Sequence, residues 1–307
     1  MIDFSKKPLF LAPLAGFSDL PLRSVVKKFG CDVTVSEMIS ANALVYESSD
    51  KTLEMLKKSP NEDPYIVQIA GSEIENLKKA VQIINKFDGI YGLDLNCGCP
   101  VLKVVRQGAG SALLNDLDKL QSIISAIKSV SNKKSLSVKF RLGFNDKNEE
   151  KIAKACEEAG ADYIAVHGRT RAGGYSAKVD YEAIARVKAS VKIPVVANGD
   201  INAQNADQIL NLTKCDALMI GRASIGNPWI FHEIKTKASV DKALKQEIIL
   251  AHFDAMIEHY GEHGLCIFRK HLHQYSKGID GATTFRNDVN FIKDVTVMRE
   301  RIREFFA

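Results

Sequence analysis

Two cysteines one residue apart, Cys97 and Cys99, are the first side chains in this 307-residue sequence that could do chemistry. They end an apolar run in the stretch "DLNCGCP". A metal site needs three or four ligands, and no second Cys or His cluster accompanies the pair. A disulfide between residues this close would be strained. We expect Cys97 to be a buried filler and Cys99, held between Gly98 and Pro100, to have a chemical role in a loop.

The other four cysteines are expected to be reduced and structural. Cys156 falls on the apolar face of a predicted helix, Cys31 and Cys215 precede predicted strands, and Cys266 opens a helix near the end of the chain. A chain of this size without a secretion signal has no need of disulfides, and no two cysteines form a CxxC pair. We therefore assign all four to packing.

Polar and small residues recur where other apolar runs end. Any one of them could cap a helix or close a turn, but their recurrence indicates a common site. Lys139 falls near the end of a strand that we expect to be buried, where an unpaired ammonium would be costly and needs an anionic partner. A reduced flavin would supply one; an ion pair with Glu37, Asp94 or Asp200 is the alternative. The segments "ANGD" (197–200) and "IGRASIG" (220–226) expose backbone amides that suit a phosphate, with Arg222 adding a charge.

The apolar runs themselves repeat one unit over the first 225 residues: a short strand, a polar or glycine-bearing turn, and a helical segment. The predicted strands are 9–16, 32–38, 64–71, 92–98, 136–143, 163–169, 193–200 and 217–223, with amphipathic segments such as 72–87, 117–130 and 148–161 between them. Eight strict βα units favour a parallel (β/α)8 TIM barrel over an open doubly wound sheet, which is the alternative. A barrel gathers the ends of its strands on one face.

The pattern changes towards the C-terminus. Residues 239–307 contain no β-rich run but have apolar residues at three- and four-residue spacing, with glycines as punctuation. We expect residues 1–238 to form the α/β barrel domain and residues 239–307 a small all-helical domain packed closely against it.

Composition and net charge indicate where in the cell the protein acts and what kind of partner it binds. The formal net charge of +5 fits an anionic partner without demonstrating one. No apolar run approaches the ~20 residues of a membrane span, and the N-terminus lacks the apolar segment of a signal peptide. We expect a cytoplasmic protein with no membrane association and no metal.

The sequence resembles the flavin-dependent tRNA-dihydrouridine synthases, most closely the bacterial B-type subfamily. Their characteristic segments occur in family order over residues 9–231: "APLAGFSDLPLR", "VSEMIS", "VQIAGS", "DLNCGCPVLKVVRQGAGSALL", "VKFRLG", "VHGRTRAGGYS", "IPVVANGDI" and "ALMIGRASIGNPWIF". Two departures are mild: Leu14 stands where Met is usual, and Cys97 where an apolar residue is usual. The resemblance implies a TIM barrel that holds FMN, followed by a helical domain that helps to hold tRNA.

The resemblance also implies roles for individual residues. FMN would be bound by Pro13, Leu14, Ala15, Gln68, Lys139, His167, Asn198, Gly199, Asp200, Gly221 and Arg222. Cys99 matches the catalytic cysteine, and Asn96 would contact the base. We assign the remaining basic residues of interest to tRNA phosphates and base edges: Lys103, Arg106, Arg141, Arg169, Arg171, Arg269 and Lys270.

The implied reaction reduces the C5=C6 bond of specific uridines, expected in the tRNA D-loop, to dihydrouridine. NADPH, or NADH in its place, would reduce FMN, whose N5 would deliver hydride to C6 while Cys99 protonates C5. A thiol with a pKa near 8.5 is mostly protonated at pH 7, whereas a carboxylic acid would already be ionised. The nucleotide must flip out of the folded RNA to reach a barrel mouth.

Two other functions stay open at this point. A flavin barrel could act on a free pyrimidine, as dihydroorotate and dihydropyrimidine dehydrogenases do, but such a substrate would not require a helical tail or basic loops. A tRNA-binding module could keep FMN as a structural element, but Cys99 and Lys139 would then have no obvious use.

Overall fold

The computed structural model describes residues 2–47 and 49–307, and its centre is a closed parallel barrel. The strands are β1 (Leu9–Leu11), β2 (Val33–Val35), β3 (Ile39–Ser40), β4 (Tyr65–Ala70), β5 (Gly92–Cys97), β6 (Ser135–Arg141), β7 (Tyr163–His167), β8 (Val195–Asn198) and β9 (Ala217–Ile220). Strand order runs β2-β1-β9-β8-β7-β6-β5-β4, and β2 pairs with β4 through Thr34 and Tyr65 to close the ring. The TIM barrel is therefore confirmed, and the open sheet is excluded.

The short strand β3 lies outside this ring. It pairs in parallel with the end of β4, where Ile39 faces Ile69 and Ser40 faces Ala70. The sequence pattern does not predict it, because a two-residue strand carries no alternation to recognise.

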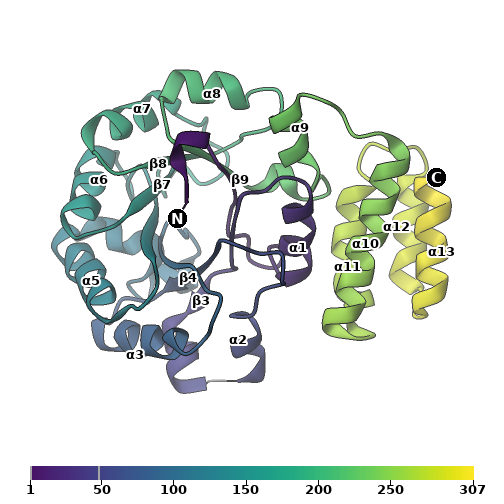
Figure 1. Cartoon of the computed structure of the whole chain (residues 1–307), viewed down its shortest axis with the longest axis horizontal. Helices are drawn as coiled ribbons and strands as arrows, with labels where there is room; N and C mark the ends of the chain where they lie inside the picture. The colour runs from purple at the N-terminus through teal and green to yellow at the C-terminus, as the bar shows by residue number, and fades with distance from the viewer. Residues whose placement is uncertain (1, 48) are drawn as a thin grey trace.

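Helices surround the barrel, as Figure 1 shows. They are α1 (Leu20–Lys28), α2 (Asp50–Glu54), α3 (Ile74–Asn85), α4 (Leu102–Val105), α5 (Leu117–Val130), α6 (Glu149–Glu158), α7 (Tyr181–Ser190), α8 (Ala206–Thr213) and α9 (Ile230–Thr236). The predicted helical segments 72–87, 117–130 and 148–161 match α3, α5 and α6 within a few residues at each end. In α3 the buried face is made by Leu77, Ala80, Val81 and Ile84, at the three- and four-residue spacing that defines an amphipathic helix.

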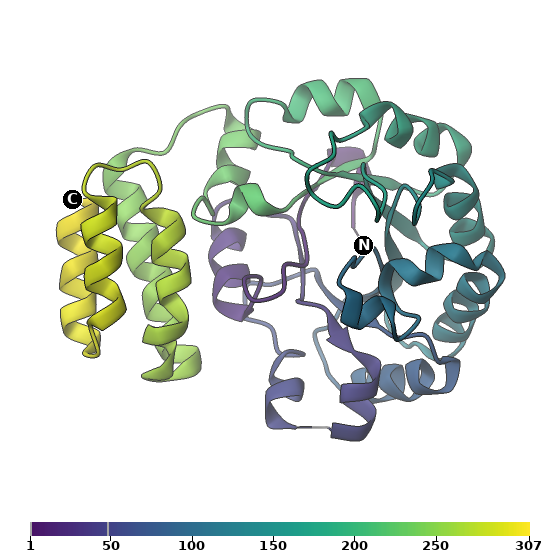
Figure 2. The same cartoon turned by 180° about the vertical axis from the view of Figure 1, so that it is seen from behind.

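Side chains of alternate strand positions fill the barrel interior. Phe10 and Tyr163 point inward with ring centroids 5.8 Å apart. Phe4 from the N-terminal segment stacks on Phe10 and meets Tyr163 at a tilt. The N-terminal segment lies at the end of the barrel that faces the viewer in Figure 1. The loops after the strands cover the opposite end, seen in Figure 2, and any open site must lie there.

The C-terminal part is a helical bundle beside the barrel (Figures 1 and 2). It consists of α10 (Lys242–Tyr260), α11 (His263–Tyr275), α12 (Ala282–Phe291) and α13 (Val295–Phe306). Its core is built from large apolar side chains such as Phe253, Phe268 and Phe285, and it also takes in Val25 of α1 and Trp229. Gly264 lets α10 and α11 approach closely, since a Cβ there would lie 2.3 Å from the Met256 carbonyl oxygen. Among the described residues, no helix has the length and apolar character that crossing a membrane requires.

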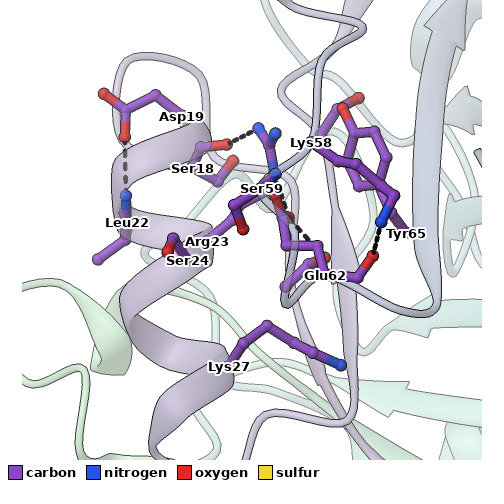
Figure 3. A network of polar contacts seen from close by, with 12 residues as sticks. Ser18, Asp19, Leu22, Arg23, Ser24, Lys27, Lys58, Ser59, Glu62 and Tyr65 are labelled. Carbon is purple, nitrogen blue, oxygen red and sulfur yellow. Dashed lines mark hydrogen bonds and ion pairs between the residues drawn. The ribbon is translucent and has the colours of Figure 1, made fainter. Parts of the chain in front are cut away.

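A buried ion pair fixes α1 to the barrel (Figure 3). Arg23 Nε lies 2.7 Å from Glu62 Oε1, and its other nitrogens donate to the carbonyl oxygens of Ser18 and Lys57. Glu62 also accepts from Thr34 Oγ1 on β2 and from the Ser59 amide. The ion pair is buried but fully hydrogen-bonded, which is the condition for tolerating such charges inside a protein. These contacts hold α1 in a fixed position between the barrel and the bundle.

Candidate active site

A cavity of about 790 Å³ opens at the carboxyl ends of the strands. All the residues assigned to FMN from the sequence line it: Pro13, Leu14, Ala15, Gln68, Lys139, His167, Asn198, Gly199, Asp200, Gly221 and Arg222. Cys99, Asn96 and Arg141 line it too. The structure therefore brings together side chains that are up to 209 positions apart in the sequence, from Pro13 to Arg222 (222 − 13).

The two thiols lie in different surroundings. Cys97 is the last residue of β5 and is fully buried, and burial raises its pKa well above the usual value. Cys99 is half-buried and lines the cavity. Its carbonyl oxygen accepts from the Ser111 hydroxyl at 2.9 Å, which ties its loop to the following segment. The structure therefore confirms the predicted difference in burial between the two cysteines.

Asn96 fixes the backbone of the Cys99 loop. Its Oδ1 accepts from the amides of Gly98 at 3.1 Å and Cys99 at 2.9 Å, so the loop leaves β5 in one defined direction. Its Nδ2 donates to Gln68 Oε1 at 2.7 Å. One Nδ2 hydrogen of Asn96 is not needed for these contacts, because an amide nitrogen carries two.

The carboxylate of Asp94 fixes the side-chain amides of Gln68 and Asn96 in place. The carboxylate accepts from Gln68 Nε2 at 2.6 Å and from the Ser137 hydroxyl at 2.6 Å. Burial raises the pKa of Asp94 to about 6, against the opposing effect of the two hydrogen bonds and of Lys139. Since an ionised Asp94 only accepts, Gln68 must turn its NH2 group to Asp94 and its oxygen to Asn96. A buried carboxylate therefore sets the orientation of both amides beneath Cys99.

Lys139 and His167 provide the polar wall of the cavity. Lys139 Nζ donates to Asn198 Oδ1 at 3.0 Å, and no carboxylate of a described residue lies within 4 Å of it. Burial, followed by the nearby Arg141, lowers the pKa of Lys139 to about 8. His167 is buried, its Nδ1 has no hydrogen-bond partner among the described residues, and burial lowers its pKa to about 2. The ion pair considered as an alternative for Lys139 does not form.

The opposite end of the cavity is cationic and glycine-rich. Asp200 pairs with Arg169 and, at 2.7 Å, with Arg222, and the hydrogen bond from Arg169 is the largest cause of its lowered pKa. About half of the Arg222 side chain is exposed. Gly199 has φ +129°, which a residue with a side chain rarely adopts. The Arg222 guanidinium therefore has hydrogen-bond donors that Asp200 does not use, close to the backbone amides at this end of the cavity.

Two arginines assigned to tRNA from the sequence are instead buried within the protein. Arg141 donates to the carbonyl oxygens of Gly98, Thr170 and Gly174, and Arg169 pairs with Asp200. These contacts fix the loops around the cavity, so neither group is free to meet an RNA phosphate. Arg141 still borders the cavity.

The other basic residues assigned to tRNA lie in varied places. Lys103 and Arg106 are exposed at α4, and Arg171 is half-buried with its guanidinium 4.8 Å from the Phe144 ring centre. In the bundle, Arg269 donates to the Ile292 carbonyl at 2.8 Å, and Lys270 lies over the Phe17 ring. Lys103 and Arg106 are the most accessible of this set.

Some features escaped the sequence analysis. Tyr175 lines the cavity, and the guanidinium groups of Arg141 and Arg222 lie 5.2 and 4.8 Å from its ring centre. An aromatic residue in the glycine-rich stretch "RAGGYS" was the available signal. Cys266 is exposed on α11, so its assignment to packing was wrong; its position in the first turn of a helix does not reveal which face it occupies.

Comparisons with known proteins bear on the chain as a whole. The family model described as "Dihydrouridine synthase (Dus)" matches residues 10–307. The chain is 50% identical over 309 residues to a probable tRNA-dihydrouridine synthase of Helicobacter pylori strain J99, covering 99% of this chain and 94% of that protein. It is 37% identical to tRNA-dihydrouridine synthase B of Pseudomonas aeruginosa, covering 97% and 92%.

Solved structures share the fold at low identity. The old yellow enzyme of Trypanosoma cruzi aligns with a TM-score of 0.57 at 12% identity, over 76% of this chain and 89% of that one. The old yellow enzyme homologue of Zymomonas mobilis aligns with a TM-score of 0.58 at 14% identity, over 77% and 90%. These neighbours support the barrel alone, whereas the family model and the close relatives cover nearly the whole chain. The chain belongs to the dihydrouridine synthase family of oxidoreductases.

Proposed function

We propose that this protein reduces the C5=C6 bond of a uridine in tRNA, in the D-loop, with FMN as cofactor and NADPH as reductant. The single observation that carries the proposal is the position of Cys99, whose half-buried thiol lines the same cavity as Lys139, His167 and Asn198. When bound, FMN would supply a hydride to C6 of the uracil.

The cavity residues fit a flavin. The Lys139 ammonium has no carboxylate partner among the described residues, and the anionic edge of a flavin ring would satisfy it. His167 Nδ1 is a buried polar atom that likewise needs a partner. Arg222 and the backbone of Gly199 and Gly221 suit the phosphate, because free donors gather there.

Cys99 would then act as the acid that protonates C5. A thiol is a suitable general acid because it transfers its proton readily to a developing enolate. Asn96 holds the loop amide of Cys99 and keeps one hydrogen of its Nδ2 for a carbonyl oxygen of the base. The chain's own groups thus orient the uracil and supply one proton.

The RNA would approach across the exposed mouth. Lys103 and Arg106 offer charges to phosphates, while Val101 and Leu102 expose apolar side chains at the same loop. We also propose that residues 239–307 form a separate domain that helps to hold tRNA, since the bundle has its own apolar core. The target uridine must leave its stack to enter the cavity.

The direct test follows the flavin colour under anaerobic conditions. NADPH should bleach the purified yellow protein, and unmodified tRNA should restore the colour while dihydrouridine appears in the RNA by mass spectrometry. Free uracil and dihydroorotate serve as controls. Restored colour with a free pyrimidine but not with tRNA would overturn the proposed substrate, and bound tRNA without any reoxidation would overturn the proposed reaction.

A further inference from the structure

Three side chains able to bind a metal meet where the bundle contacts the barrel. Asp19 precedes α1, His252 lies in α10 and His271 in α11, and one ligand atom from each lies within 4.8 Å of the other two. All three are buried, with 5%, 0% and 1% of their surface exposed. Figures 1 and 2 agree that α1 stands between the barrel and the bundle at this place, which we call the seam.

Both imidazoles leave a nitrogen without a partner at the seam. His252 Nδ1 lies 2.8 Å from the Tyr275 hydroxyl, while Nε2 of His252 and Nε2 of His271 are buried and have no hydrogen-bond partner among the described residues. When Nδ1–H donates to Tyr275, Nε2 of His252 carries the lone pair. A hydrogen bond on the far nitrogen is the usual way in which a metal-binding histidine is oriented.

Asp19 completes the set with an oxygen that has room for a further partner. Its Oδ1 caps α1 by accepting from the Leu22 amide at 3.2 Å, and Oδ2 accepts a long contact from the Tyr260 hydroxyl at 3.3 Å. Figure 3 shows the carboxylate turned away from Arg23 and Glu62, which satisfy one another. Each carboxylate oxygen has two lone pairs, so neither contact saturates it.

The groups at the seam are consistent with a cation between them. Two buried imidazole nitrogens without a hydrogen-bond partner among the described residues, beside a buried carboxylate, are costly inside a protein. A bound cation would satisfy both nitrogens and neutralise the carboxylate.

The nearest cations do not provide that neutralisation. Lys270 is close enough to influence all three groups, but its amine lies over the Phe17 ring at 5.4 Å and makes no ion pair with Asp19. The remaining surroundings are aromatic: the ring of Phe268 lies 5.0 Å from His252, and that of Phe17 lies 5.4 Å from His271. Such a shell excludes water and strengthens metal–ligand bonds.

Against the expectation of no metal drawn from the sequence, we propose that the seam binds one divalent transition-metal ion, with zinc preferred, through Asp19, His252 Nε2 and His271 Nε2. Two imidazoles and one carboxylate are ligands for zinc and its neighbours, whereas magnesium and calcium prefer oxygen atoms. Ligand atoms around tetrahedral zinc lie roughly 3.3 Å apart, so the three groups close in by rotation of their side chains. The Phe17 ring both lines the cavity and contacts His271. The metal has a structural role and joins the bundle to α1.

The test measures metal in the resting protein, without tRNA or NADPH, so its outcome does not depend on the proposed reaction. After dialysis to remove loosely held ions, purified protein should retain about one zinc per chain by mass spectrometry. Chelator-treated protein should regain it on titration with Zn²⁺ and unfold at a higher temperature. Three variants probe the ligands: Asp19→Asn, which can still cap α1, His271→Gln, and Tyr275→Phe, which removes the group that orients His252.

Asp19→Asn and His271→Gln should lower zinc affinity at least as much as the 10- to 100-fold expected for Tyr275→Phe. His273→Gln, on the same helix but bonded to Asn290, is the matched control and should bind zinc as the parent protein does. Folded, yellow protein that retains no metal and shows no change in Tm with Zn²⁺, Co²⁺ or Mn²⁺ overturns the proposal. So does undiminished zinc binding by Asp19→Asn and His271→Gln.

Discussion

At the scale of single residues, the two thiols near β5 differ in what they can reach. Cys97 packs in the apolar layer outside the barrel, where burial raises its pKa, and it is not among the residues that line the cavity. Cys99, two residues later, borders the cavity. The change of direction at Gly98, held by Asn96 Oδ1, separates a packing residue from one that lines the cavity.

Cys99→Ala should separate the two halves of the reaction. We expect the variant to keep FMN and to be reduced by NADPH, but to be reoxidised by tRNA about 10²–10⁴-fold more slowly, because general acid catalysis is lost. Stopped-flow absorbance measures both steps. Cys97→Ala is the matched control and should lower stability with little effect on rate. A slow Cys97→Ala and a normal Cys99→Ala would reverse the two assignments.

Asp94→Asn should impair the site without touching substrate. The substituted amide can present NH2 where Gln68 needs an acceptor, so Gln68 and Asn96 lose their fixed orientations and the Cys99 loop loosens. We expect a lower kcat for tRNA reduction, weaker FMN binding and a nearly unchanged affinity for tRNA. Flavin titration and single-turnover kinetics measure these quantities. An unchanged kcat would show that Asp94 does not position the loop.

The sequence predicted which residues line the cavity better than it predicted which groups the arginines would contact. Gln68, Lys139 and His167 end apolar runs, and the geometry of a barrel brings such ends together. Arg141 and Arg169 also follow such runs, yet their partners are loop carbonyl oxygens, such as those of Gly98 and Ala177. Loop conformation has no periodicity to recognise, so the pattern could not distinguish an exposed guanidinium from one that holds a loop.

At the scale of elements, α1 connects parts of the molecule that are distant in sequence. One face packs on β2, another contacts α10, and its buried Arg23–Glu62 pair joins it to the loop before β4. Its N-terminal cap, Asp19, lies at the seam. The position of α1 therefore depends on the buried Arg23–Glu62 ion pair as well as on the burial of apolar side chains.

Arg23→Met should destabilise the protein by about 3–5 kcal/mol, because Glu62 would be left buried without its partner. Urea denaturation measures the change. The double variant Arg23→Met/Glu62→Gln removes both charges and should recover part of the loss, since an uncompensated charge is the main cost. A double variant as unstable as the sum of the two single variants would show that the ion pair itself contributes little coupling.

The short helix α4 carries the charges that we expect to meet RNA. Lys103→Ala combined with Arg106→Ala should weaken tRNA binding and reduce the dependence of affinity on salt by roughly two phosphates' share, while NADPH oxidation stays intact. Binding titrations at several salt concentrations measure both effects. Lys154→Ala, which removes an exposed charge on α6, is the control. Equal losses in the control would indicate a general charge effect.

Helices and strands were predicted most reliably where their apolar residues recur at a regular spacing. Strands β4 to β9 and helices α3, α5 and α6 each bury a regular face, which apolar periodicity reports directly. The two-residue strand β3 and the four-residue helix α4 are too short for any period to appear. Their existence depends on tertiary pairing and on loop contacts.

At the scale of the whole molecule, buried histidines should make stability sensitive to mild acid. His167, His252 and His271 have folded-state pKa values below their unfolded value, so the unfolded chain binds protons first and stability falls as pH drops through about 6.5. Asp19 and Asp94 have pKa values raised to about 6, so the folded chain gains protons first there and offsets part of the loss below pH 6.

We therefore expect Tm to begin falling as the pH drops below about 7 and to keep falling towards pH 5, because three histidines outweigh two carboxylates. Differential scanning calorimetry with a chelator present measures this without a contribution from bound metal. A Tm that rises steadily from pH 7 to pH 5 would contradict the sign of the effect.

The chain's single tryptophan gives an optical consequence of how the bundle is attached. Trp229 stacks near Tyr275, with ring centroids 6.1 Å apart, and Tyr275 in turn contacts His252 at the seam. Its emission therefore reports on the bundle, whereas flavin colour would report on the barrel. Two native signals, read in one cuvette, would reveal whether barrel and bundle melt together or one after the other, with no label attached.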